Sequence, residues 1–180
     1  MIDTHNAFRG QMRGRARSRG IALPVVLLIA AMMLATSAAW FDVSVTTTRN
    51  ATGLYDHLLA LHAADAALTS CARSVVNGSI APMLSAQAVL GEPVGWKSQT
   101  TFESNAIAPF ASWPASTAIR APQCLIEVWR LTNRTDAQAY LVTARGYGRN
   151  VDAQVWLQLQ LVTAGGTVEK HWRRVAARPF

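Results

Sequence analysis

The feature that most constrains this chain of 180 residues is an uncharged run from Ile21 to Phe41, interrupted only by Pro24 and two hydroxyl residues. A helix of this length, rising about 1.5 Å per residue, crosses a hydrocarbon core of about 30 Å. The apolar part of a secretory signal is usually about 7–15 residues long, so this run is longer than the apolar part of a typical signal. The small residues of "ATSAAW" at 35–40 still leave a cleaved signal open. We expect residues 21–41 to form a membrane-spanning helix.

The charges of the chain lie mainly at its two ends. Residues 1–20 hold five arginines and one aspartate and close with Gly20, whereas residues 21–168 hold eight basic and eight acidic side chains. The net charge of +7 therefore does not indicate a basic face on the body of the protein, and we expect no nucleic-acid partner. Basic residues beside an apolar span stay in the cytoplasm, which places everything after residue 41 on the other side of the membrane.

The exported part holds two cysteines, Cys71 and Cys124. Disulfides persist outside the cytoplasm, and two cysteines there most simply form one bridge. Two unpaired thiols are the alternative. Neither cysteine has a Cys or His neighbour at the spacing of a zinc site, so we expect neither a metal nor another cofactor.

Residues 42–77 predict that the helix continues in amphipathic form. A β-branched segment at 43–53 is poor helix material, but beyond it side chains recur at steps of three and four, which places them on one helical face. Asn77-Gly78 then provides a C-terminal stop. The stripe consists of Leu54, Leu58, Leu61, Asp65, Leu68, Ala72 and Val75.

Asp65 is the one acid on this stripe. A buried carboxylate must be paired or hydrogen-bonded, because an unmatched buried charge is costly. We therefore expect Asp65 to form a polar link between the helix and a sheet, with an exposed position or a contact to another protein as the alternatives.

The remainder of the chain predicts a small antiparallel sheet. Residues 78–122 read as an irregular region with a short helix near 81–90, because glycine, serine and proline punctuate short apolar pieces. Within 123–180, period-two patterns at 124–132, 139–148 and 152–164 predict three successive strands, and the end gives a fourth edge strand or a basic tail. A meander with one buried face can be covered by the amphipathic half of the helix, so the expected class is α+β.

No set of residues in the sequence predicts catalysis. His62 and Asp65 lie three residues apart on one helix, a spacing that indicates the polar flank of an amphipathic helix rather than a metal or acid–base site. "ARGYGRN" at 144–150 has glycines but no following helix to bind a phosphate, so it indicates the end of a hairpin. We do not expect an enzyme.

This combination of leader, helix and small sheet resembles the type IV pilins, and more narrowly the PilX-type minor pilins. The resemblance covers about 20–76 and 123–162 of this chain. Its motifs are "RGIALPVVLLIA" at 19–30, "LALHAADAAL" at 59–68 and the closing strands "YLVTARGYGRNVDAQVWLQLQL" at 140–161.

The resemblance implies a processing event and a set of partners. A prepilin peptidase would cut the leader 1–20 between Gly20 and Ile21, and the new amino group of Ile21 would be methylated. Residues 21–41 would then anchor the protein in the bacterial inner membrane, with the N-terminus cytoplasmic and the C-terminal domain periplasmic, before they enter the helical core of a pilus. The implied partners are other minor pilins, the major pilin and the inner-membrane assembly platform.

The chain departs from the major-pilin pattern at Val25. Major pilins usually have glutamate as the fifth residue of the mature chain, where it is thought to pair with the N-terminal amine of a neighbouring subunit. A valine cannot neutralise that amine, so we expect a subunit with nothing ahead of it, at or near the tip, where it primes or caps assembly. Two alternatives stay open, namely a minor pseudopilin of a type II secretion system and an uncleaved single-pass anchored periplasmic domain.

Overall fold

The computed structural model describes residues 22–79, 84–114 and 118–180 of the chain. Its contacts divide the protein into two compact units, Met1–Thr48 and Arg49–Phe180. In the first unit the described residues are all helical, whereas the described residues of the second unit form the rest of that helix, one sheet and two short helices.

The long N-terminal helix is α1, Ala22–Val76. It confirms the predicted continuous helix, since the β-branched segment does not interrupt it. Its threonines are accommodated by hydrogen bonds to the preceding turn: the hydroxyl of Thr46 donates to the carbonyl of Asp42 at 2.9 Å, and that of Thr47 to the carbonyl of Val43 at 2.8 Å. Such back-bonding satisfies the hydroxyl within the helix. The helix ends where predicted, at Gly78 with a left-handed φ of 68°.

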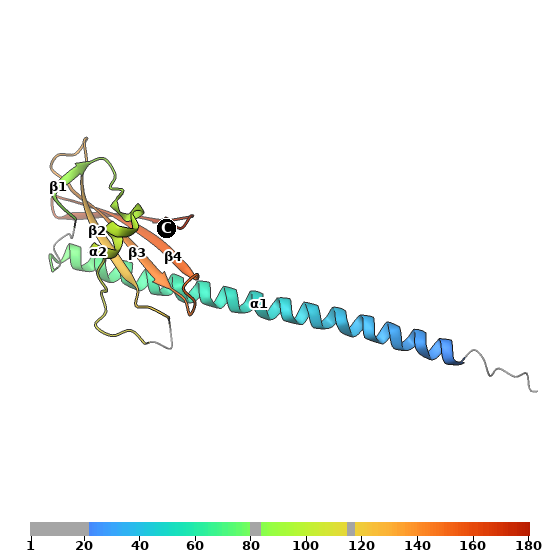
Figure 1. Cartoon of the computed structure of the whole chain (residues 1–180). Coiled ribbons are helices and arrows are strands. Elements are labelled where there is room, and N and C mark those ends of the chain that lie inside the picture. Colours follow the sequence, from blue (N-terminus) through green and yellow to red (C-terminus); the bar gives the residue numbers. More distant parts are fainter. Residues whose placement is uncertain (1–21, 80–83, 115–117) are drawn as a thin grey trace, which may run out of the picture. The chain divides into compact units, whose positions relative to one another are not determined.

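The sheet has five strands in the order β1-β2-β3-β4-β5. Strands β2, β3 and β4 lie side by side in Figure 1, and β5 continues them as an antiparallel meander. This confirms the three predicted strands and shows the last segment to be an edge strand. A turn with positive φ at both Gly165 and Gly166 joins β4 to β5. The strands are β1 Leu84–Leu90, β2 Gln123–Arg130, β3 Gln138–Tyr147, β4 Gln154–Ala164 and β5 Thr167–Arg174.

The region 78–122 differs from its prediction. The short helix expected near 81–90 is wrong, because Leu84–Leu90 forms β1, which pairs parallel to β2. A parallel pair needs a long crossover, and the chain between the two strands supplies it with a 3₁₀ helix, η1 Gly95–Lys97, and a short α2, Gln99–Asn105. The Ser98 hydroxyl caps α2 by accepting the backbone N–H of Thr101 at 3.3 Å.

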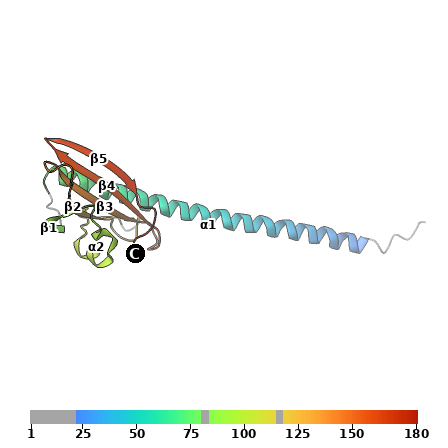
Figure 2. The same ribbon diagram turned by 90° about the horizontal axis from the view of Figure 1, so that it is seen from above.

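The second half of α1 and the crossover cover opposite faces of the sheet (Figure 2). One face carries a mixed core of small helix residues and aliphatic strand residues, and the other carries an aromatic core that includes the end of the chain. The first core contains Ala60, Ala64, Ala67, Leu68, Cys71, Cys124, Ile126, Val142, Ala144, Leu157 and Leu161. The second contains Trp96, Phe102, Leu125, Leu141 and Trp156, with Val175 and Phe180 against it.

Gly146 on β3 marks the closest approach of α1 to the sheet. A Cβ atom there would lie 2.1 Å from the carbonyl oxygen of Ala60 and 2.4 Å from the backbone nitrogen of Ala64. Backbone atoms of a helix cannot move aside like the end of a flexible side chain. The glycines of "ARGYGRN" therefore serve helix–sheet packing, in addition to the hairpin end expected from sequence.

We predict that Gly146→Ala lowers the free energy of unfolding by about 3 kcal/mol, because overpacking against fixed backbone forces α1 off the sheet. Chemical denaturation of the full chain in detergent measures the effect. Gly53→Ala is the matched control, since nothing lies within 4 Å of its added Cβ, and an interior helical glycine replaced by alanine should stabilise α1 by about 1 kcal/mol. Wild-type stability in Gly146→Ala would contradict the packing described.

Candidate functional site

The first half of α1 presents an unbroken apolar surface. Within the described part of the chain, α1 is long and apolar enough to cross a membrane, and a signal sequence would pass the same test of length and composition. None of its most apolar stretch is buried against the protein. An exposed surface of this extent marks a contact with lipid or with other proteins. Its large side chains are Leu23, Val25, Val26, Leu27, Leu28, Ile29, Met32, Met33, Leu34, Trp40, Phe41 and Val43.

Val25 lies in the first turns of α1, and its side chain is 48% exposed. The first turn of the helix contains no acidic residue, and Pro24 fits there because the missing N–H would lack a helical partner in any case. Gly20 and Ile21 lie outside the described residues, so cleavage and methylation at that bond stay predictions.

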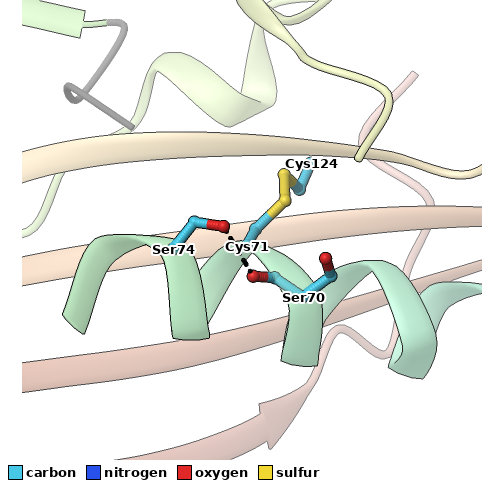
Figure 3. Close-up of a disulfide and its surroundings, with 4 residues drawn as sticks. All are labelled: Ser70, Cys71, Ser74 and Cys124. Carbon is cyan, nitrogen blue, oxygen red and sulfur yellow. Dashed lines mark hydrogen bonds between the residues drawn. A yellow bond between two sulfur atoms is a disulfide. The ribbon is translucent and has the colours of Figure 1, made fainter. Parts of the chain in front are cut away.

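The predicted disulfide between Cys71 and Cys124 is confirmed. It joins α1 to β2 with a Cα–Cα distance of 6.6 Å, and both residues are fully buried (Figure 3). Beside it, the Ser74 hydroxyl donates to the carbonyl of Ser70 at 3.0 Å and so stays within the helix. A bridge over 53 residues of chain contributes about 4 kcal/mol in the chain-entropy account.

The structure does not form the polar link expected at Asp65 and instead agrees with the exposed position that stood as an alternative. Its side chain is exposed, and across the described ranges it forms no hydrogen bond or ion pair. The side of α1 that faces the sheet carries mainly small residues: Ala60 and Ala64 are fully buried and Leu68 is 2% exposed, while Leu54 and Leu58 remain exposed. The close approach at Gly146 selects small residues, and this rotates the buried stripe away from Asp65.

A different acid provides the polar link between helix and sheet. Asp56 of α1 accepts a hydrogen bond from Nε of Arg149 at 2.9 Å, just beyond β3. The Arg149 guanidinium also lies 5.0 Å from the centre of the Tyr55 ring. The hydrogen bond that Arg149 donates to Asp56 raises the pKa of Arg149. Sequence reasoning missed this pair because the two residues are separated by 93 positions, and Asp56 lies off the leucine stripe.

On the opposite face of the sheet, Arg145 of β3 is enclosed by aromatic rings. Its guanidinium lies 4.9 to 5.6 Å from four ring centres, which belong to Phe102, Tyr147, Trp156 and Phe180. It donates to the Gln123 side-chain oxygen at 2.7 Å. Burial lowers the pKa of Arg145. Cation–π contacts of this kind offset part of the desolvation cost and hold the chain end against the sheet.

Glu127 of β2 is a second buried charge on that face, with 4% of its surface exposed. Its Oε1 accepts the backbone N–H of Gly95 at 2.9 Å, whereas Oε2 is buried and has no partner in the described part of the chain. Desolvation raises the pKa of Glu127 above its ordinary value of 4.5, and the hydrogen bonds from Gly95 and Trp96 only partly oppose that. The Glu127 carboxyl group anchors the crossover to the sheet, but its ionised form lowers the stability of the fold because burial desolvates the charge.

We predict that Glu127→Gln removes a pH-dependent loss of stability. A carboxyl whose folded pKa is raised binds more protons in the folded state, so its contribution to stability falls as pH rises from about 4.5 through the folded pKa. Glutamine keeps an acceptor for Gly95 and does not ionise. The gain in unfolding free energy of the variant should therefore grow between pH 4 and pH 7, as measured by urea denaturation at each pH. Glu103→Gln, at an exposed position on α2, is the control; equal slopes for Glu127→Gln and wild type would refute the assignment.

Among the described residues, no group of three His, Cys, Asp or Glu side chains is placed to hold a metal ion. Compared with protein-family models the chain matches none, and it has no significant match among curated proteins or among solved structures. Its architecture is nonetheless pilin-like: a long apolar N-terminal helix whose second half packs on an antiparallel sheet.

Proposed function

We propose that this protein is a minor pilin that helps to prime or cap the assembly of a type IV pilus, at or near its tip, after its leader is cleaved between Gly20 and Ile21. The observation that carries the proposal is the division of α1. Its first half exposes apolar side chains all round, and its second half is locked to a disulfide-bonded sheet. A helix of this kind serves first as a membrane anchor and then as one of the helices that form the core of the filament.

The exposed half of α1 supports this role because its surface suits two environments. In the inner membrane, lipid covers the apolar side chains, and the basic leader keeps the N-terminus cytoplasmic. In a filament, the helices of the major pilin and of other minor pilins would replace the lipid. Removal of the leader takes away the charges that would otherwise resist extraction by the assembly platform. On this proposal the protein is a substrate of the prepilin peptidase and has no catalytic role of its own.

Val25 supports a position at or near the tip. An apolar side chain cannot neutralise the N-terminal ammonium group of a subunit ahead of it, and an unpaired charge in an apolar bundle is costly. A subunit with no neighbour ahead incurs no such cost. A minor pseudopilin at the tip of a type II secretion system would share this feature, so it is the second candidate. Co-purification with pilus or with secretion components separates the two.

We predict that the mature protein begins at Ile21 and carries a methyl group on its amine when it is expressed with a prepilin peptidase. Intact-protein and peptide mass spectrometry measure this. Gly20→Val should block cleavage, because the peptidase needs a small residue just before the bond that it cuts. Gly14→Val in the same leader should be processed normally. A wild-type chain that retains Met1, or one that begins near Trp40, would instead support an uncleaved anchor or a removed signal.

We predict that immunogold label against this protein lies at the ends of sheared pili. Val25→Glu should leave pili intact and shift part of the label onto the shaft, because the variant can pair with a subunit ahead. Val26→Glu is the control, since it introduces the same charge one position away and should reduce incorporation instead. Wild-type label along the shaft, with none at the tips, would overturn the proposed position.

A further inference from the structure

Strand β5 leaves one edge of the sheet open. It is the last strand in the order, and within the described part of the chain it pairs only with β4. Figure 2 shows it as the outermost strand on its side. Seven of its eight residues are exposed, and its register with β4 is continuous from Thr167 to Arg174. An edge of this length with neither a proline nor a bulge is a template for pairing with another strand.

The register shows which backbone groups face outward. The N–H of Val175 donates to the carbonyl of Trp156 at 3.2 Å, and Trp172 lies opposite Leu159. Hydrogen-bonded and non-hydrogen-bonded pairs alternate in an antiparallel ladder, so Arg173 and His171 direct their backbone groups to β4. The outward-facing backbone groups belong to Val168, Lys170, Trp172 and Arg174.

A hollow of about 340 Å³ lies beside this edge, between α1 and the sheet. Leu68 and Leu159 are among its apolar lining residues, and Lys170 and Trp172 of β5 border it. Its charged lining residues on α1 are one acid, Asp65, and one base, Arg73, so α1 adds no net charge to the hollow. The Trp172 side chain is 56% exposed. A strand added to β5 would place alternate side chains on this side of the sheet, where they would cover the indole and enter the hollow.

The charges of β5 indicate what kind of strand fits. Its basic residues are Lys170, His171, Arg173 and Arg174. Its acid, Glu169, pairs with Arg134 at 3.0 Å, and Arg173 pairs with Glu92. Lys170 and Arg174 are therefore its cations without an acidic partner among the described residues. Opposite charges across a strand pair stabilise it, and like charges directly opposite destabilise it. A second copy of β5 would set cations against cations, whereas an acidic strand would be complementary.

We propose that the open edge of β5 and the adjoining hollow form a docking site for an extended acidic segment of another protein, which adds as a further strand of the sheet. Main-chain hydrogen bonds supply affinity in this mode, and the alternate side chains supply specificity. The proposal concerns only the unit Arg49–Phe180 and does not depend on cleavage of the leader or on a place in a pilus.

The test uses the full chain in detergent and a fluorescent peptide of alternating valine and glutamate, as long as β5. Fluorescence anisotropy should show saturable binding of this peptide and none of the matched valine–lysine peptide. Lys170→Pro removes an outward-facing N–H without breaking a bond to β4, and should weaken binding by about tenfold or more. Lys170→Gln is the matched control for loss of charge alone and should have a smaller effect.

Hydrogen exchange keeps the test decisive if Lys170→Pro perturbs the strand. In the wild-type chain, peptide binding should slow exchange of the amides of Lys170, Trp172 and Arg174 more than those of their neighbours in β5. Absence of binding, equal loss in Lys170→Gln and Lys170→Pro, or protection elsewhere in the sheet would overturn the proposal. So would concentration-dependent self-association abolished by Lys170→Pro, which would identify a second copy as the occupant.

Discussion

The contact on which the second unit depends is the backbone-to-backbone approach of α1 to β3 at Gly146. Because a Cβ atom there would collide with the carbonyl of Ala60, only small side chains fit between helix and sheet at this point. Further along α1 the interface also accommodates Leu68. The alanines of α1, the buried disulfide to Cys124 and the position of Asp56 beside Arg149 all follow from this spacing. Dispersion contacts are strongest where surfaces meet this closely, so an interface with few large side chains can still be firm.

Both faces of the sheet are covered, and this decides which surfaces remain for contacts with other proteins. The second half of α1 covers one face, and the crossover with the chain end covers the other. Two buried charges, Glu127 and Arg145, lie on the outer side of the sheet and hold the crossover and the chain end in place. What remains outward in this unit includes the outer side of the second half of α1, the loops and strand β5, while the first unit exposes its apolar helix.

Local patterns in the sequence were sufficient for the helix, its stop at Gly78 and the three central strands, because each depends on spacing within a short window. They were not sufficient for β1, whose parallel pairing with β2 is made across more than thirty residues. The buried stripe of α1 was misplaced for a related reason. Leucines indicate a buried face only when the opposing surface has room for them, and Gly146 removes that room from a distance of about eighty residues along the chain. The Asp56–Arg149 pair was missed for the same reason, since 93 positions of sequence separate the two residues.

The disulfide also determines how the protein bears mechanical load. Cys71 lies near the C-terminal end of α1, so a force applied to the N-terminal part of the helix acts in shear on the alanine interface before it reaches the bridge. Shear along the interface between α1 and the sheet strains many side-chain contacts at once. The disulfide between Cys71 and Cys124 then prevents the helix from separating from the sheet. Extension of the chain under tension would therefore have to begin elsewhere, in the sheet or within α1 itself.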